Sequence, residues 1–208
     1  MPREWDGLVS AHINRKLSVP LARSLLEVEW VTPNGVTLVS TLVGLLSAAA
    51  FFFLNPLLGA LLAQASSVLD GVDGDLAEMR GQKSGFGAFL DSVLDRFVDV
   101  AIIMGVARYS LGLYSSDLVL PAALGAVSGG LLVSYVAAKG ELDLGSPLRS
   151  GFRATYLASR DVRLFLVMVF GLASRPLLLL GVLAVTTYVS ALARLVQTVV
   201  ALGGKGRV

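Results

Sequence analysis

The sequence predicts an all-α integral membrane protein in which six transmembrane helices follow an N-terminal amphipathic juxtamembrane helix. Hydrophobic residues make up 55% of the chain and charged residues only 15%, whereas soluble domains carry about 25% charged residues. The apolar residues also gather in stretches that approach the roughly 20 residues needed to cross a bilayer. We therefore expect one membrane domain over residues 1–208, with the juxtamembrane helix at 1–31 and the six-helix bundle at 32–202.

The N-terminal region has the periodicity of an amphipathic helix. Between residues 6 and 29 the apolar residues recur on one helical face, at Leu8, Val9, Ile13, Leu17, Leu21, Leu25 and Val28. Such a helix lies at the membrane surface with its apolar face in the lipid. A soluble helix packed on a second domain is the alternative, but the sequence has no obvious second domain for it to pack on.

Proline and polar residues separate six apolar stretches. Pro33 ends the preceding segment, and Thr32 or Asn34 can cap the helix that follows. Asn55-Pro56 predicts a tight turn. The predicted spans are residues 35–54, 57–77, 86–112, 118–138, 162–174 and 177–200, with a polar loop at 139–160 and a flexible basic tail from 203.

The basic residues predict the orientation. Six spans place both termini on one side of the membrane, and only Arg108 and Arg175 lie near the other side. The remaining loop and terminal basic residues share the side of the termini, which the positive-inside rule makes cytoplasmic. We expect a cell-membrane protein with both termini in the cytoplasm and no nucleic-acid partner, because basic residues beside spans usually report topology.

Four aspartates form the most informative pattern. Asp70 and Asp73 share one face of a predicted helix, and Asp91 and Asp95 share one face of the next. An acidic residue inside a span costs roughly 2.5–3.5 kcal/mol on insertion scales, so these carboxylates need cations between them. Oxygen ligands without His or Cys favour hard ions such as Mg²⁺ or Mn²⁺, and ion pairs serve phosphoryl displacement. We predict a site for two divalent ions near the cytoplasmic face, rather than a solvated loop with incidental acids.

Small residues accompany the aspartates. Gly71, Gly74, Ala77 and Gly87 lie in the same two predicted helices, where glycine is unfavourable on propensity alone. They permit either close helix packing or the approach of a phosphate to the backbone. The sequence leaves both explanations open.

This stretch follows the pattern Asp70-x2-Asp73-Gly74-x2-Ala77, then Gly87-x3-Asp91-x3-Asp95. The pattern resembles the signature of the CDP-alcohol phosphotransferase family, and the spacing of every acid matches. The six-span architecture and the juxtamembrane helix resemble the family too. One position departs, since the family usually has arginine directly after the alanine and this chain has Glu78, with Arg80 as the candidate substitute.

The resemblance implies an enzyme that transfers a phosphoryl-alcohol group from a CDP-alcohol to an acceptor alcohol and releases CMP. Asp70, Asp73 and Asp91 would hold the metal that binds the diphosphate. Asp95 would complete the second metal site and act as the catalytic general base on the acceptor hydroxyl. The implied CDP-binding residues are Asn34, Thr37, Asp70, Asp73, Gly74, Ala77, Gly87 and Asp91.

Two further patterns resemble the membrane domain of archaeal di-myo-inositol phosphate phosphate synthases. They are Asp6-Gly7-x-Val9-Ser10-x3-Asn14-Arg15-x2-Ser18 and the run 66–75. This resemblance implies CDP-inositol as the donor and inositol phosphate as the acceptor. In that group the domain is often fused to a soluble cytidylyltransferase, so we expect a separate enzyme to supply the donor here. The resemblance leaves a homodimer open.

Basic residues suggest where a phosphorylated acceptor binds. Lys139, Arg149, Arg153 and Arg160 follow the fourth span, and Arg194 lies inside the sixth. Arginine binds phosphate through paired hydrogen bonds. The positive-inside rule accounts for arginines in a cytoplasmic loop, but it does not account for Arg194 inside a span. We predict that Lys139, Arg153 and Arg194 bind the acceptor phosphate.

Two alternatives remain at the level of the sequence. A phospholipid head-group enzyme such as an archaetidylinositol-phosphate synthase would use a lipid-linked CDP donor. A cation transporter or channel belongs to another class, but its acids would track across the membrane, whereas these cluster at one face.

Overall fold

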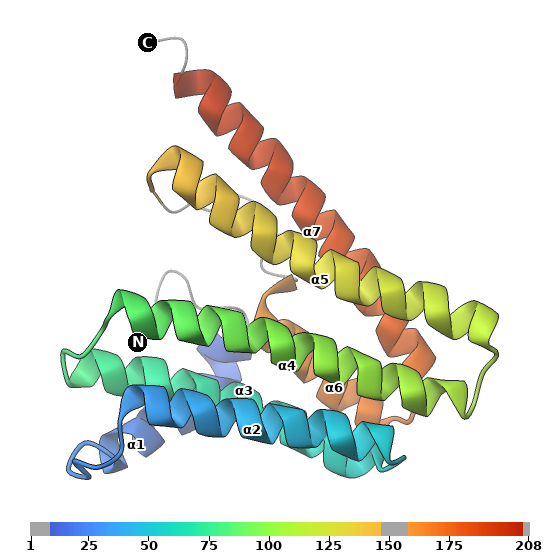
Figure 1. Cartoon of the computed structure of the whole chain (residues 1–208), viewed down its shortest axis with the longest axis horizontal. Helices are drawn as coiled ribbons and strands as arrows, with labels where there is room; N and C mark the ends of the chain where they lie inside the picture. Colours follow the sequence, from blue (N-terminus) through green and yellow to red (C-terminus); the bar gives the residue numbers. More distant parts are fainter. Residues whose placement is uncertain (1–8, 147–157, 206–208) are drawn as a thin grey trace.

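The computed structural model describes residues 9–146 and 158–205, which form helices and contain no strand. A π-helical turn at Ser10–Asn14 leads into α1 (Arg15–Ser24), and six longer elements follow (Figure 1). These are α2 (Pro33–Phe52), α3 (Pro56–Met79), α4 (Gly85–Leu111), α5 (Ser116–Leu144), α6 (Arg160–Leu172) and α7 (Pro176–Lys205). Each coincides with one predicted apolar stretch.

The capping residues explain where the helices begin. Thr32 Oγ1 accepts a hydrogen bond from the Gly35 N–H and caps α2, with Pro33 in the first turn. Asn55 Oδ1 accepts from the Leu58 N–H at the start of α3. Side-chain caps of this kind satisfy N–H groups that have no partner within the helix. The predicted cap at Thr32 and the predicted helix boundary at Asn55-Pro56 are therefore confirmed.

Three boundaries differ from the prediction. Regular helix α1 ends at Ser24 instead of reaching residue 29, because the carbonyls beyond it bind Arg80. The Arg80 guanidinium donates to the carbonyl oxygens of Leu25 (2.6 Å), Val28 (3.0 Å) and Val31 (2.5 Å), and also to that of Leu26. This contact joins the end of α3 to the segment between α1 and α2.

The other two corrections concern the ends of α5 and α7. Helix α5 continues to Leu144, so Lys139 lies on a helix and not in a loop. An ion pair between Lys139 and Asp143, at the i,i+4 spacing of a helix, accompanies this extension. Helix α7 continues to Lys205, into the predicted tail.

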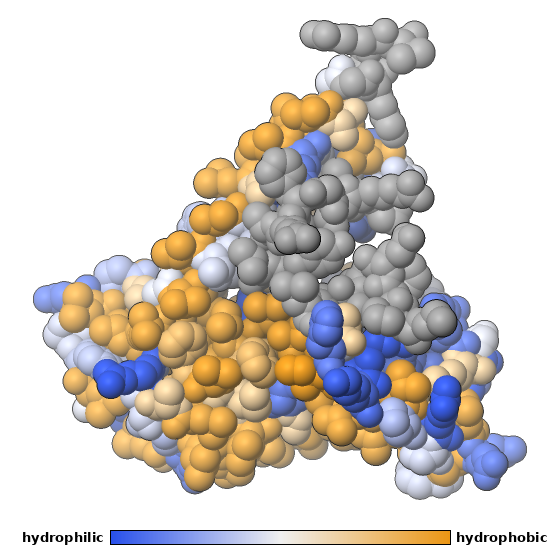
Figure 2. Space-filling model, turned by 180° about the vertical axis from the view of Figure 1, so that it is seen from behind, coloured by the Kyte–Doolittle hydropathy of each residue, from blue (hydrophilic) through white to orange (hydrophobic). Residues whose placement is uncertain are grey.

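Within residues 9–146 and 158–205, three helices are long and apolar enough to cross a membrane, namely α2, α5 and residues Pro176–Gly203 of α7. Of the others, α3 and α4 carry the aspartates, and α6 has only 13 residues, fewer than the roughly 20 of a complete span. Figure 2 shows hydrophobic residues over most of the coloured surface, as expected of a membrane protein. The count of six spans stays a prediction.

The packing arranges the helices in two groups. Helix α2 packs against both α3 and α4, α6 packs against α3, and α5 packs against α7. In Figure 1 the pair α5 and α7 slants away from the group α2, α3 and α4. The main buried cluster joins the groups through residues such as Phe51, Ile102, Leu164 and Leu179. Small residues allow the closest approaches, as at Gly105 against α2.

The π-helical turn and α1 contact α3 through both polar and apolar residues. Asn14 Nδ2 donates to Ser67 Oγ (2.9 Å), and Ser18 Oγ donates to Asp75 Oδ2 (2.8 Å). Ala22 is fully buried in one cluster with Val72 and Leu76 of α3. Leu17, an apolar residue of the predicted stripe, is 54% exposed.

We expect Gly105→Ala to lower the stability of the purified protein. A Cβ at this position would lie 2.3 Å from the carbonyl oxygen of Ala48, a backbone atom that cannot rotate away, and overpacking costs about 1–3 kcal/mol. Gly181→Ala is the matched control, because a Cβ there meets nothing within 4 Å. Thermal unfolding in detergent measures both, and a Gly105→Ala midpoint equal to that of the control would contradict the packing argument.

Candidate active site between α3 and α4

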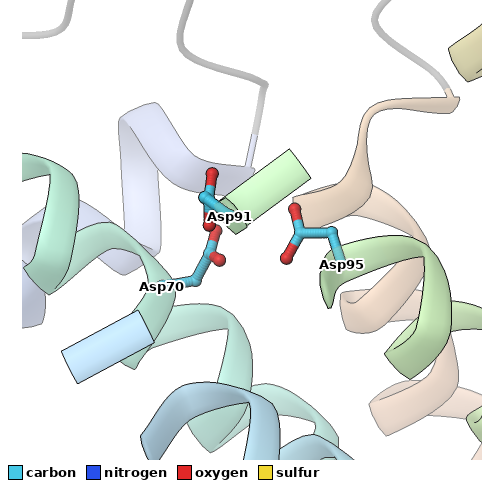
Figure 3. A group of neighbouring side chains, drawn as sticks. All are labelled: Asp70, Asp91 and Asp95. Atoms are coloured by element: carbon cyan, nitrogen blue, oxygen red, sulfur yellow. The ribbon is translucent and has the colours of Figure 1, made fainter. Parts of the chain in front are cut away.

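Three of the four predicted metal ligands meet where α3 ends and α4 begins. Asp70 lies on α3, and Asp91 and Asp95 lie on α4. One carboxylate oxygen from each lies within 4.8 Å of the others. Figure 3 shows Asp70 and Asp91 directed toward each other, with Asp95 facing them from the next turn of α4. We call this group the aspartate cluster.

Asp73 does not belong to the aspartate cluster. It is only 7% exposed, and its Oδ2 accepts a short hydrogen bond of 2.5 Å from Thr37 Oγ1. The structure therefore ties one predicted metal ligand to a predicted CDP-binding residue on α2. Its role as a metal ligand stays a prediction.

The aspartate cluster has the chemistry of a site for a hard divalent cation. Its donors are all carboxylate oxygens, the ligand type that Mg²⁺ and Mn²⁺ prefer. The Oδ1 atom of Asp91 is buried and accepts no hydrogen bond from the described residues. A buried polar atom without a partner is rare in folded proteins, and a bound cation would satisfy it. The residues present thus fit a metal.

Arginines from α4 and α6 compensate the acids within the protein. Arg160 Nη1 lies 2.6 Å from Asp70 Oδ1, and Arg160 Nη2 lies 3.0 Å from Asp95 Oδ1. Arg163 Nη2 lies 2.9 Å from Asp99 Oδ2. Buried charges persist in proteins when they are paired in this way. The arginines give α6 a charged edge that faces the acids of α4.

Arg96 pairs with two acids of its own helix. Its guanidinium lies 3.7 Å from Asp95 and 3.5 Å from Asp99. Arg160, by contrast, was grouped with the loop arginines. Its contacts depend on the packing of α6 against α3, which the local pattern does not reveal. In the sequence, only the uncompensated negative charge of the aspartates indicated that a basic residue from another helix would pair with them.

A cavity of about 310 Å³ adjoins the aspartate cluster. Its walls come from the start of α2, the end of α3, the start of α4 and the break between α3 and α4. The lining residues are Pro33, Asn34, Thr37, Asp73, Gly74, Ala77, Gln82, Lys83, Ser84, Gly87, Ala88 and Asp91. Every predicted CDP-binding residue except Asp70 is among them, so segments far apart in the sequence converge as predicted.

The glycines near the cavity have different roles. A Cβ at Gly74 would meet nothing within 4 Å, so this residue keeps part of the cavity open. A Cβ at Gly87 would lie 3.0 Å from Asn34 Oδ1, and one at Gly71 would lie 3.2 Å from Ser18 Oγ. Gly71 and Gly87 therefore allow close packing. Close helix packing thus explains Gly71 and Gly87, whereas open space for a phosphate explains Gly74.

The break between α3 and α4 adds residues that the sequence pattern did not single out. Gln82, Lys83 and Ser84 line the cavity. Glu78, at the position where the family usually has arginine, lies 3.1 Å from Lys83 Nζ. Arg80 is not among the residues that line the cavity. Its guanidinium binds carbonyl oxygens of residues 25–31 instead. Whether Arg80 substitutes for the arginine that the family usually has at position 78 stays a prediction.

The predicted acceptor residues Lys139 and Arg194 are neither among the described residues that line this cavity nor in the aspartate cluster. Lys139 is ion-paired with Asp143 at 2.6 Å on an exposed part of α5. Arg153 lies outside the described residues. Arg194 is half-buried on α7. Their binding to an acceptor phosphate stays a prediction.

Residues 30–200 match the family model of the CDP-alcohol phosphatidyltransferases. The chain belongs to this family. The predicted family is thereby confirmed.

Two relatives show how the family members differ. Over 171 residues the chain is 41% identical to the bifunctional IPC transferase and DIPP synthase of Archaeoglobus fulgidus, a match that covers 81% of this chain and 33% of that protein. It is 29% identical to the archaetidylinositol phosphate synthase of Pyrococcus horikoshii, over 89% of this chain and 94% of that one. The chain thus spans only 33% to 42% of the bifunctional relatives that it matches.

Solved structures of the family share this fold. The phosphatidylinositol phosphate synthase of Mycobacterium tuberculosis with CDP-DAG bound has a TM-score of 0.73 at 27% identity, covering 88% of this chain and 94% of that one. A second crystal structure of that enzyme, in complex with manganese and citrate, has a TM-score of 0.71 at 26% identity. The manganese complex, together with the aspartate cluster, indicates that the family site uses a divalent metal.

We expect Gly74→Ala to weaken nucleotide binding without loss of stability. The added methyl group would take up space in the cavity, and one tenfold loss of affinity corresponds to about 1.4 kcal/mol. Isothermal titration with CMP gives the affinity, and thermal unfolding gives the stability. Gly181→Ala, which also adds a methyl group in open space, should leave CMP affinity unchanged. Equal CMP affinity in wild type and Gly74→Ala would mean that the nucleotide does not approach this wall.

Proposed function

We propose that this chain is a metal-dependent membrane enzyme that transfers a phosphoryl-alcohol group from a CDP-alcohol to an acceptor alcohol. One observation carries the proposal, namely that Asp91 belongs both to the aspartate cluster and to the wall of the adjoining cavity. A diphosphate held at Asp91 would reach the cluster while its nucleoside fills the cavity. The family membership supports the same chemistry.

The bonds that change follow from the two substrates. The acceptor hydroxyl attacks the phosphorus that carries the donor alcohol, the bond from that phosphorus to the oxygen of CMP breaks, and CMP leaves. Divalent ions, when bound, would offset charge on the diphosphate. Asp95 would accept the proton of the acceptor hydroxyl, since it lies in the cluster on the next turn of α4 after Asp91.

The metal would be held by Asp70, Asp91 and Asp95, with Asp73 completing the set of four predicted ligands. We propose two Mg²⁺ or Mn²⁺ ions. Asn34, Thr37, Gly74, Ala77 and Gly87 would border the CDP group. The hydrogen bond from Thr37 to Asp73 supports this arrangement, because it fixes a carboxylate at the border of the cavity.

We further propose that α2 to α7 are six membrane segments and that both termini and the active site face the cytoplasm. The exposed apolar side chains of α2, α5 and α7 support contact with lipid. The predominance of basic residues on the side of the termini supports the orientation. Helix α1 would then lie at that membrane surface with Leu17 and Leu21 toward the lipid.

For the substrates we propose CDP-inositol as donor and inositol phosphate as acceptor. The 41% identity with a bifunctional IPC transferase and DIPP synthase supports this pair. A lipid-linked donor is the second candidate, favoured by the archaetidylinositol phosphate synthase that the chain covers almost completely. An apolar cavity of about 480 Å³ between α1, α2 and α3 offers room for an acyl chain.

CMP release from a panel of donors tests both the reaction and the substrate. Purified protein would be incubated with CDP-inositol or with lipid-linked CDP-alcohols, each with inositol phosphate and Mg²⁺ or Mn²⁺. We expect metal-dependent CMP release with CDP-inositol. Release only with the lipid-linked donors would select the second candidate, and the absence of release with every pair would reject the proposed function.

We expect Asp95→Asn to bind the donor but to lose transfer. The base acts on the acceptor, so turnover should fall by at least about a hundredfold, within the range for general bases, while CMP affinity changes much less. Asp117→Asn, at an exposed position of α5, is the control and should retain activity. If CMP affinity and turnover fall together, Asp95 is a metal ligand without a role in proton transfer.

We expect Arg194→Gln to raise the acceptor KM about ten- to a hundredfold, because a charge-assisted hydrogen bond contributes roughly 1.5–3 kcal/mol. The donor KM should stay nearly constant. Arg175→Gln, at an exposed position before α7, removes the same charge elsewhere and should change neither constant. Unaltered kinetics with inositol phosphate would remove Arg194 from the acceptor site.

A further inference from the structure

The guanidinium of Arg160 lies within the aspartate cluster. It forms ion pairs with Asp70 at 2.6 Å and with Asp95 at 3.0 Å, two of the three carboxylates that gather there. Its side chain is only 11% exposed. Arg160 is thus a buried cation inside the group of acids that would hold the metal, and it comes from a different helix.

Charge and geometry make this arginine a competitor for the same oxygens. The guanidinium offsets one of the three negative charges of the aspartate cluster, so it lowers the charge that is available to a second divalent ion. A divalent ion needs carboxylate oxygens at about 2.0–2.6 Å, and a guanidinium needs them at about 2.7–2.9 Å. A second divalent ion beside Asp70 and Asp95 would meet both a shortage of ligands and the repulsion of a like charge.

We propose that Arg160 occupies the second cation position of the aspartate cluster. While the guanidinium is in place, the cluster binds one divalent ion, and the second binds only after the guanidinium has withdrawn. This inference rests on the proposed function, because it takes the cluster to be the metal site. Arg160 is accordingly a positioning residue that sets how many ions the cluster holds.

Asp99 is an alternative partner for the guanidinium when it leaves Asp70 and Asp95. Arg160 is the first residue of α6, so its backbone lies at a helix end. Asp99 lies one helical turn beyond Asp95, and its Oδ1 is 3.9 Å from Arg160 Nε, while its Oδ2 pairs with Arg96 and Arg163. Movement toward Asp99 would keep the arginine paired, which avoids the large penalty of a buried unpaired charge. The neighbouring Asp161 accepts a 2.6 Å hydrogen bond from the Ser10 N–H, which anchors the start of α6.

Manganese binding tests the inference without relying on turnover. Free Mn²⁺ is counted by electron paramagnetic resonance while the full chain in detergent, stripped of metal with EDTA, is titrated. We expect one tightly bound Mn²⁺ in wild type. In Arg160→Gln we expect two, with the affinity of the weaker site raised at least tenfold. The same stoichiometry and affinity in both proteins, or weaker binding in the variant, would overturn the inference.

Two further variants make the result specific. Arg108→Gln removes an arginine that lies over the Phe52 ring at the far end of α4, and it should bind Mn²⁺ as wild type does. Arg160→Lys keeps a charge but cannot contact two carboxylates in a fork, so it should bind the second Mn²⁺ more tightly than wild type and less tightly than Arg160→Gln. If Arg160→Gln does not fold, Arg160→Lys decides, and binding no tighter than wild type rejects the competition.

The outcome also separates this inference from the proposed function. If Mn²⁺ binds neither to wild type nor to the variants, the aspartate cluster is not a metal site and the proposed function loses its basis. If wild type and Arg160→Gln both bind two ions with equal affinity, the metal site stands and only the role of Arg160 is wrong.

Discussion

The need to compensate buried carboxylates determines the arrangement of this protein. Asp70, Asp91 and Asp95 lie at the ends of helices whose surroundings are largely apolar, where an unpaired charge is costly. The compensation comes from another helix, because Arg160 at the start of α6 reaches two of the three acids. Helix α6, with 13 residues, is shorter than a complete span. The arginines of its first turn hold it against the acids of α3 and α4.

Contacts of the carboxylates also connect the aspartate cluster to the adjoining cavity. Thr37 on α2 hydrogen-bonds Asp73 on α3, and Asp91 on α4 lies both in the aspartate cluster and on the cavity wall. Three helices therefore fix the carboxylates relative to the cavity. Small residues allow this convergence, because a side chain larger than that of Gly87 would press on Asn34.

The local features of the fold could be predicted from the sequence. Apolar stretches, the caps at Thr32 and Asn55 and the shared face of Asp91 and Asp95 depend on residues a few positions apart, and all of these appear in the structure. Features that depend on tertiary contacts could not. The early end of α1 needs Arg80 to bind its carbonyls, and the pairing of Arg160 needs α6 to pack on α3. The hydrogen bond between Asp73 and Thr37 likewise needs α2 to pack on α3.

The contact of α1 with α3 has a consequence for how the N-terminal helix is held. In the proposed membrane placement, α1 gains little from apolar contact with α3, because the acyl chains are equally apolar. The hydrogen bonds of Asn14 and Ser18 act beside the packing of Ala22 on α3, and they are directional, whereas apolar contact is not. Sliding α1 by one residue would break both, so its register along α3 is discrete. Two small polar side chains thus fix the position of the N-terminal helical segment along the helix that carries Asp70 and Asp73.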